Sequence, residues 1–260
     1  MAAIKIAIQL AGLRMPFRKA VVTAARLGAT GVEIDARGDV RPDELGQTGL
    51  REVRRLLEEN DLRVVAVGFQ TRRGYEVPDE IERRVAATKA AMKFAADLRA
   101  PVLINQAGRV PDEPQGAAWN LLIQTLADIG SYGQHVGVML AALTGAESGA
   151  DLARLIGALP PAAIGANLDP GGLIINGFSP RQAVEELGAN ILHVHARDAV
   201  RDLARGRGLE VPLGRGSVDF PGLLGALEEL PYRGSFTIAR SSAEAPEFEI
   251  GEAVKYLRSL

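Results

Sequence analysis

The stretch PDEIERRVAATKAAMKFAADLRAPVLINQ, residues 78–106, contains one complete α/β unit. Pro78 and the acidic residues after it precede a long segment with apolar residues at helical spacing. This combination predicts the start and the body of an amphipathic helix. The segment ends in PVLINQ, a short apolar run of the kind that forms a buried strand. A helix followed by a buried strand is the repeating unit of a parallel sheet.

The same alternation runs through the whole chain. Short apolar runs bounded by Gly, Pro or Asp alternate with amphipathic segments such as residues 50–60. The eight expected strands are residues 4–10, 31–35, 62–69, 101–106, 137–143, 163–169, 191–196 and 235–239. Eight such units in 260 residues predict an α/β fold, a (β/α)8 TIM barrel, with residues 1–260 as a single domain. The alternative is an open doubly wound sheet, but AGLRMPF follows the first strand in place of a G-x-G-x-x-G turn.

Charge and composition exclude several classes of protein. The 30 Lys and Arg residues and the 32 Asp and Glu residues are interspersed, with a net charge of -2, so no basic surface for nucleic acid is expected. Cysteine is absent, which excludes disulfides and thiolate chemistry. No signal-peptide pattern is seen, and no apolar run reaches the ~18 residues of a membrane span. We therefore expect a soluble cytoplasmic protein without a nucleic-acid or membrane partner. The sequence leaves open whether the protein forms a homo-oligomer.

The carboxyl ends of the strands are where a barrel of this kind places its active site. Glu33 alternates with apolar neighbours, so its side chain is expected to point into the barrel, where a carboxylate needs a partner such as Arg197 or Arg240. An internal salt bridge without a chemical role is the alternative interpretation of Glu33. The polar candidates at strand ends are Gln9, Glu33, Asp35, Asn105, Gln106, Asp169, His193, His195 and Arg240.

The stretch ILHVHARD, residues 191–198, holds two of the three histidines of the chain. His193 and His195 have the same strand parity, so their side chains point the same way, with Asp198 just beyond. They are either ligands or acid–base groups, or hydrogen-bonded core residues. The third histidine, His135, is expected in a helix-to-strand turn on the opposite, structural face.

Two predicted turns, at Asp169 and at Arg215 to Asp219, each allow both a structural and a functional interpretation. Asp169 ends a strand and precedes Pro-Gly-Gly, so it is either a ligand or catalytic carboxylate or the start of an Asx-turn. Arg215 lies between two glycines, whose backbone N–H groups are able to cradle an anion, and Asp219 has the position of a helix N-cap. Residues 198–220 form the longest irregular segment and are expected to be a functional loop.

The sequence motifs of serine-triad hydrolases and of P-loop proteins are absent, so neither class of protein is expected.

The strand ends, taken together, resemble a known family. The stretches GVEID, GANLDPGGL, ILHVHARD, VPLGRGSVDFPGLLGALEEL and YRGSFTIAR are similar, in this order, to the sugar phosphate isomerase/epimerase family of xylose isomerase-like TIM barrels. Members of that family hold one divalent metal ion with a Glu, an Asp, a His and a second Glu, and the two glutamates move a proton beside the sugar carbonyl. By motif position, the resemblance implies Asp169 and His195 as the metal-binding Asp and His.

Both glutamates of the family pattern are replaced. LAALTG places Leu143, and GSFTIAR places Ala239, where the family has its glutamates. Hydrocarbon side chains bind no cation, and two ligands fall short of the roughly six that Mg²⁺ or Mn²⁺ prefers. We therefore expect a divalent cation (Mg, Mn or Zn) to be weakly bound or absent. No relocated pair of carboxylates is evident among the nearby acids, which are Glu33, Asp35, Glu147, Asp198 and Glu244.

Two hypotheses of function remain, and the sequence leaves open whether the protein is an enzyme. The first is a divergent isomerase or epimerase acting on a small-molecule sugar or polyol, with Glu33, Asp169 and His195 as catalytic residues. The second is a non-catalytic barrel that binds a carbohydrate without metal. The residues expected to contact the ligand are Gln9, Asn105, Gln106, His193, Asp198, Arg215 and Arg240. A multi-zinc DNA-repair enzyme is excluded, since three histidines and a near-neutral surface do not suit it.

Overall fold

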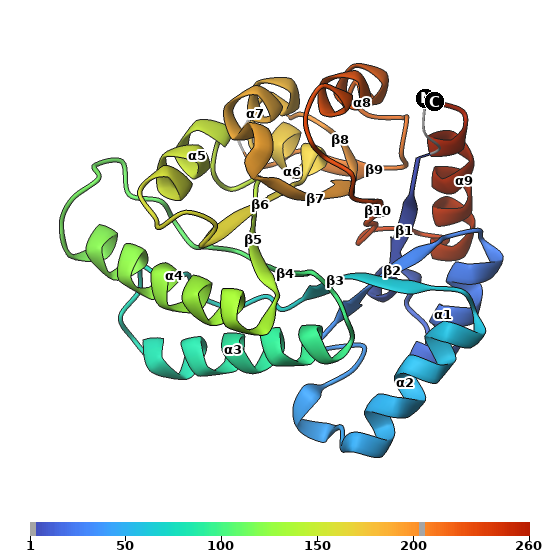
Figure 1. Ribbon diagram of the computed structural model, residues 1–260. Coiled ribbons are helices and arrows are strands. Elements are labelled where there is room, and N and C mark those ends of the chain that lie inside the picture. The colour runs from blue at the N-terminus through green and yellow to red at the C-terminus, as the bar shows by residue number, and fades with distance from the viewer. Residues whose placement is uncertain (1–3, 203–205) are drawn as a thin grey trace.

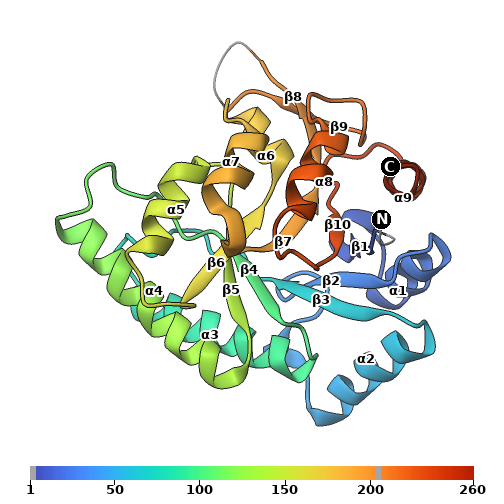
Figure 2. The ribbon, with the colours of Figure 1, turned by 45° about the horizontal axis from the view of Figure 1, so that its top comes forward.

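The computed structural model describes residues 4–202 and 206–260. Residues 1–3, at the start of the predicted domain, and 203–205, within the predicted loop, lie outside the described residues. Parallel strands close into a barrel in the order β1-β10-β7-β6-β5-β4-β3-β2, and helices surround it (Figures 1 and 2). The predicted (β/α)8 barrel is confirmed, and an open doubly wound sheet is excluded because β1 pairs with both β2 and β10.

The strands of the barrel fall within the eight predicted runs, but are shorter by up to three residues. They are β1 (Ile6–Gln9), β2 (Gly31–Asp35), β3 (Arg63–Gly68), β4 (Val102–Asn105), β5 (Met139–Leu143), β6 (Ile164–Leu168), β7 (Ile191–Ala196) and β10 (Phe236–Ile238). The α-helices are α1 (Phe17–Arg26), α2 (Gln47–Glu59), α3 (Ile81–Asp97), α4 (Ala117–Val136), α5 (Gly149–Gly157), α6 (Pro170–Ile175), α7 (Pro180–Leu187), α8 (Phe220–Glu228) and α9 (Pro246–Arg258). Three 3-10 turns are η1 (Leu10–Leu13), η2 (Pro42–Glu44) and η3 (Gly188–Asn190).

Alternation along each strand decides which side chains face the helices and which face the barrel interior. On β2, Val32 and Ile34 belong to the large apolar core between strands and helices, whereas Glu33 between them does not. A separate small apolar cluster, formed by Ala66, Val102, Ile104 and Ala141 of β3, β4 and β5, fills part of the interior. The interior is therefore apolar beside β3 to β5, and polar beside β2, β6 and β7.

The segment predicted as a long irregular loop contains a small hairpin. β8 (Asp198–Val200) pairs antiparallel with β9 (Leu209–Val211), so that Ala199 lies opposite Glu210. The helix after it starts as predicted, since the Asp219 carboxylate accepts the N–H of Gly222 at the start of α8. Within the described part of the chain, no helix combines the length and the apolar character that crossing a membrane requires.

Candidate functional site at the carboxyl ends of the strands

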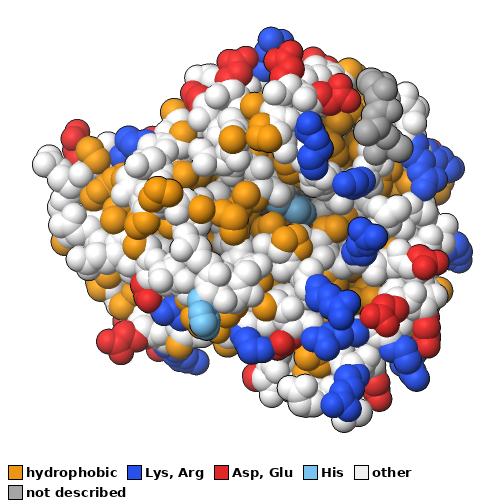
Figure 3. All heavy atoms as spheres, in the orientation of Figure 1, with side chains coloured by type: hydrophobic (Ala, Val, Ile, Leu, Met, Phe, Trp, Pro, Cys, Tyr) orange, Lys and Arg blue, Asp and Glu red, His pale blue; other side chains and the backbone are white. Residues whose placement is uncertain are grey.

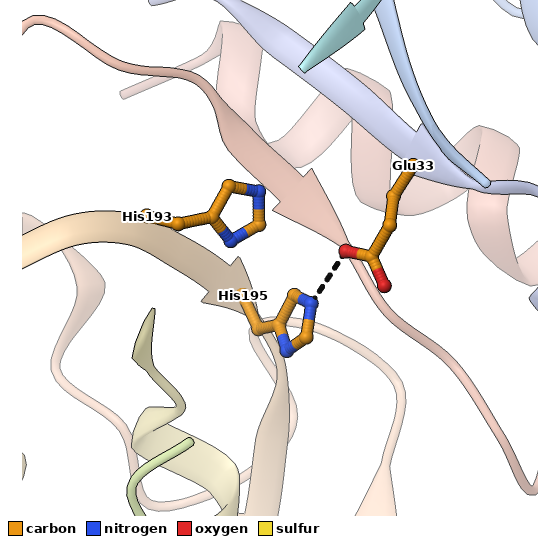
Figure 4. Close-up of side chains that lie close together, drawn as sticks. All are labelled: Glu33, His193 and His195. Carbon is orange, nitrogen blue, oxygen red and sulfur yellow. Dashed lines mark hydrogen bonds and ion pairs between the residues drawn. The ribbon is translucent and has the colours of Figure 1, made fainter. Parts of the chain in front are cut away.

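A hydrogen bond across the barrel interior joins Glu33 to His195. The barrel places β1 and β10 between β2 and β7, so a direct contact between β2 and β7 crosses the interior. His195 Nε2 lies 2.7 Å from Glu33 Oε2 (Figure 4). Gln9 Nε2 donates to Glu33 Oε1 at 2.8 Å. Glu33 is thus an interior carboxylate, as predicted, but its partner is a histidine. Neither Arg197 nor Arg240, the predicted partners, is hydrogen bonded to it.

Asn167 of β6 links the two histidines and decides where their protons lie. Its Nδ2 faces His195 Nδ1 at 3.0 Å, and its Oδ1 faces His193 Nδ1 at 2.8 Å. An amide nitrogen only donates, so His195 Nδ1 carries a lone pair and the ring's proton is on Nε2, toward Glu33. His193 in turn donates from Nδ1 and accepts the hydroxyl proton of Thr237 at Nε2, 2.8 Å away. Every polar atom of the two rings is therefore paired.

Burial and charge shift the titration of these three groups in different directions. Burial by itself raises the pKa of Glu33, but the facing His195 and the hydrogen bonds to it lower that pKa to about 2. For His195, burial lowers the pKa, yet Glu33 more than offsets this and leaves the pKa above its ordinary value. For His193, burial and the neighbouring His195 outweigh the opposite effect of Glu33 and lower the pKa to about 3. The site therefore holds an ionised Glu33 beside a basic imidazole, with a neutral His193 behind it.

Asp169 has the turn role, which is one of the two roles that the sequence left open, and it also forms an ion pair. Its Oδ1 accepts the N–H of Gly172 at 2.8 Å and caps α6, which is the turn role. Its Oδ2 accepts from Arg197 Nη1 at 3.0 Å, and its backbone N–H donates to the hydroxyl of Thr144 at 2.8 Å. The Asp169 side chain is only 3 % exposed. Its negative charge is therefore balanced from within the protein, by Arg197.

Arg197 belongs to a chain of ion pairs that continues over the rim of the barrel. Its Nη2 lies 3.2 Å from Glu210 Oε2 on β9, and Arg240 Nη1 lies 2.8 Å from Glu210 Oε1. Arg240 also pairs with Glu249 of α9 at 2.8 Å. Burial lowers the pKa of Arg197, but Asp169 and Glu210 raise it above its ordinary value. Arg240, a predicted ligand contact, thus has a structural set of partners.

Several other predicted ligand contacts have structural partners as well. Asn105 is fully buried, and it accepts the backbone N–H of Thr71 and donates to the hydroxyl of Tyr75. Arg215 is exposed, and its flanking glycines do cradle an anion, but that anion is the carboxylate of Asp198. The N–H groups of Gly214 and Gly216 therefore already have an acceptor from the same chain. His135 lies in the last turn of α4, at an exposed position.

Cavities lie on both sides of the barrel. At the carboxyl ends of β4 and β5, a cavity of about 510 Å³ is lined by residues that include Gln106, Leu143, Glu147 and Phe178. At the amino-terminal ends of the strands, a cavity of about 450 Å³ is lined by residues that include Val64, Val102 and His193. A space-filling view shows a hollow in the middle of one face, with a histidine side chain among apolar ones (Figure 3). Glu33 and His195 line neither cavity and are closed from solvent.

A divalent metal ion finds few free donor atoms here. Glu33, His193 and His195 each offer one atom within 4.8 Å of the others, which is a spacing that suits an ion. However, both ring nitrogens of both histidines already take part in hydrogen bonds. The ends of β5 and β10 add only Leu143 and the buried Ala239. As these side chains stand, neither imidazole presents a lone pair to an ion.

Sequence reasoning missed Glu210, Asn167 and Thr144. Glu210 lay in a segment predicted to be irregular, and no local signal indicates that β9 carries it to Arg197 and Arg240. Asn167 had a usable signal, because it shares strand parity with Asp169 and a polar residue in an apolar strand needs partners. Thr144 directly follows Leu143, and its hydroxyl accepts the backbone N–H of Asp169, a partner 25 residues further along the chain.

Comparisons with known proteins agree with this architecture. The model of the family described as "Xylose isomerase-like TIM barrel" matches residues 21–260. The chain is similar to the structure of a xylose isomerase domain protein from Planctomyces limnophilus, with 23% identity, 91% of this chain and 90% of that chain covered, and a TM-score of 0.83. No curated protein matches the chain.

Two further solved structures are more distant in sequence. One is D-psicose 3-epimerase with D-tagatose from Clostridium cellulolyticum H10, at 14% identity over 98% of this chain and 99% of that chain, with a TM-score of 0.79. The other is a xylose isomerase-like TIM barrel protein from Mycobacterium smegmatis in complex with magnesium, at 16% identity over 99% and 96% of the two chains, with a TM-score of 0.78. At these identities the likeness concerns the fold.

Proposed function

The chain belongs to the xylose isomerase-like TIM barrel family, and from this membership we propose that it acts on a sugar or polyol as an isomerase or epimerase without a divalent metal ion. The observation that carries the proposal is the buried hydrogen bond between His195 and Glu33 at the carboxyl ends of the strands. The similarity to D-psicose 3-epimerase supports the class of ligand. The replacement of two glutamates by Leu143 and Ala239 supports the absence of a metal ion.

His195 is the proton acceptor in this proposal, and Glu33 is the group that stabilises the resulting positive charge. A carboxyl group with a pKa of about 2 is a weak base at neutral pH, whereas the imidazole beside it has a raised pKa. The lone pair is on His195 Nδ1, so Asn167 releases this nitrogen when substrate binds. The proton leaves the carbon beside the sugar carbonyl for His195 Nδ1, and its electron pair forms an enediolate. The hydroxyl proton of that carbon moves to the former carbonyl oxygen, and His195 returns its proton to the former carbonyl carbon, so that the carbonyl group moves to the neighbouring carbon. A single base works from one face of the sugar, which favours isomerisation over inversion.

The cavity at the ends of β4 and β5 is the proposed place for the sugar. Its volume of about 510 Å³ lies in the range of small-molecule sites. Gln106, a predicted ligand contact, lines it, and so does Leu143. Leu143 is the register partner of Asn167, whose amide contacts His195. The cavity and the base are therefore separated by one pair of side chains.

Deuterium exchange tests this proposal. The protein is incubated in D2O with a panel of aldoses and ketoses in the presence of EDTA, and NMR follows deuterium entering the carbon beside the carbonyl. We expect exchange that EDTA does not alter and that falls ~10²–10⁴-fold in His195→Ala, the typical effect of losing a general base. His135→Ala, at an exposed position on α4, is the matched control. Exchange that persists in His195→Ala, or that requires added metal, would contradict the proposal.

A second candidate is a carbohydrate-binding barrel without catalysis. It is favoured by the burial of Glu33 and His195, and by the hydrocarbon side chains of Leu143 and Ala239 at two strand ends. Saturation-transfer NMR distinguishes the two candidates. Binding of a sugar without any deuterium exchange identifies the second candidate, and binding with exchange identifies the first.

A further inference from the structure

We infer that the guanidinium group of Arg197 is the resident cation of this site, held on the carboxylate on which the family pattern places a metal ion. Arg197 and a divalent ion would then compete for Asp169. The inference goes beyond the proposed function, because it concerns which cation neutralises the site and not which reaction follows.

The buried carboxylate of Asp169 needs a positive charge beside it. Its side chain is 3 % exposed, and a buried carboxylate is costly unless an opposite charge and hydrogen-bond donors accompany it. The N–H of Gly172 supplies a donor for Oδ1 but no net charge. The cation within reach is Arg197, whose Nη1 lies 3.0 Å from Oδ2.

Arg197 is held in place by a second carboxylate. Glu210, 4 % exposed, accepts from Nη2 of Arg197 and is itself held by Arg240. The ion pairs alternate in sign from Asp169 through Arg197, Glu210 and Arg240 to Glu249. A planar guanidinium with donors in a fixed fork suits two carboxylates that approach from different elements. This arrangement keeps the negative charge of Asp169 paired with the guanidinium group of Arg197.

The strand ends that lost their glutamates are consistent with this role of Arg197. Ala239 lines the same small cavity as Arg197 and Arg240. With alanine there and Leu143 on β5, one carboxylate of the family's ligand set is left, and one guanidinium balances it. A divalent ion added beside Arg197 meets a like charge, and neither Leu143 nor Ala239 offers it an anionic ligand. Arg197 and the two apolar replacements thus form one consistent set of changes.

Thermal unfolding with and without Mn²⁺ tests this inference and needs no substrate. The variants are Arg197→Ala, which removes the cation, Arg197→Lys, which keeps one positive charge, and Arg181→Ala, an exposed control on α7. We expect 10 mM Mn²⁺ to raise the midpoint of Arg197→Ala by about 3 °C or more, because an ion that binds only the folded state stabilises it. The midpoints of the wild-type protein, Arg197→Lys and Arg181→Ala should move by less than about 1 °C.

The double variant Asp169→Asn/Arg197→Ala locates the ion. Its response to Mn²⁺ should vanish, since the carboxylate that receives the ion is gone. Equal Mn²⁺ shifts in the wild-type protein and in Arg197→Ala would overturn the inference, and so would the absence of a shift in Arg197→Ala. If Arg197→Ala does not fold without an ion, the yield of refolding with and without Mn²⁺ replaces the midpoint, and the same outcomes decide.

Discussion

Two sets of strand ends at the barrel rim differ sharply in what they present: we call β2, β6 and β7 the polar side, and β5 and β10, which flank β6 and β7, the apolar side. β2, β6 and β7 end in ionisable or amide side chains, and Glu33, Asn167 and His195 are connected by hydrogen bonds. β5 and β10 end in Leu143 and Ala239, and their registers with β6 and β7 are unbroken. The backbone frame is thus the same on both sides, while the chemistry is confined to one. A shared fold is therefore a weak guide to chemistry, which depends on the side chains at the strand ends.

The polar side is closed upon itself, and this has a physical reason. Each buried donor or acceptor without a partner costs about 1–3 kcal/mol, so buried polar groups that hold no ligand are stable only when they pair with one another. Arg197, Asn167 and Thr237 provide that pairing for Asp169 and the two histidines. The apolar side needs no such compensation, because Leu143 and Ala239 carry no polar atoms beyond the backbone. The following predictions alter one side at a time.

Restoring the lost acids should have the largest effect. Leu143→Glu/Ala239→Glu adds two carboxylates at a half-buried and a buried position, and we expect a loss of about 5 kcal/mol in the free energy of unfolding in EDTA. Urea unfolding measures this loss. The uncharged variant Leu143→Gln/Ala239→Gln is the matched control and should lose about half as much or less. Equal losses in the two variants would mean that size, and not charge, limits these positions.

Removing the charge on the polar side should have the next largest effect. The pKa of Glu33 is about 2 in the folded protein and 4.5 ordinarily, so its ionisation stabilises the fold above pH 4.5, and this contribution is lost as pH falls toward 2. We expect Glu33→Gln to lose about 3 kcal/mol at pH 7 and to show a smaller further loss of stability between pH 4.5 and 3. Urea unfolding at several pH values is the measurement. Glu82→Gln, at an exposed position, should match the wild-type protein.

The two sides also differ in which of their features could be predicted from the sequence. The eight strands could be predicted because apolar alternation is a local property, and the inward direction of Glu33 followed from its neighbours Val32 and Ile34. Its partner could not, because only the closing of the barrel brings β7 opposite β2. The hydrocarbon side chains of Leu143 and Ala239 are plain in the sequence.

Local sequence patterns did not identify the hydrogen-bond and ion-pair partners in this chain. The glycines around Arg215 correctly indicated an anion cradle, but the anion is Asp198, brought there by the turn after β9. Arg197 was expected to reach Glu33, yet it lies on Asp169 and Glu210, and Glu210 depends on an antiparallel hairpin without a sequence signal. Hydrogen-bond partners on different strands follow from tertiary geometry, which spacing along the chain does not encode.

A smaller effect is expected from the neutral histidine behind the site. The pKa of His193 is about 3 in the folded protein and 6.5 ordinarily, so below pH 6.5 the unfolded chain binds a proton that the folded ring refuses. Stability from this source is complete above pH 6.5 and falls by about 1.4 kcal/mol per pH unit below it, which is about 2 kcal/mol at pH 5. His193→Asn should flatten this slope between pH 6.5 and 5, and the exposed His135→Asn should not. If the pH dependence of stability is the same in both variants as in the wild-type protein, His193 does not contribute to the loss of stability in acid.

The smallest effect concerns Thr144, the polar residue that the loop after β5 contributes to the other side. Its hydroxyl accepts the backbone N–H of Asp169 at 2.8 Å, and both residues are buried. Thr144→Val keeps the shape and removes the acceptor, so the N–H is left unpaired and we expect a loss of about 1–2 kcal/mol in the free energy of unfolding. Thr144→Ser keeps the hydroxyl and should lose less than half of that. If valine is tolerated as well as serine, the end of β5 does not position Asp169, and the two sides of the rim are independent of each other.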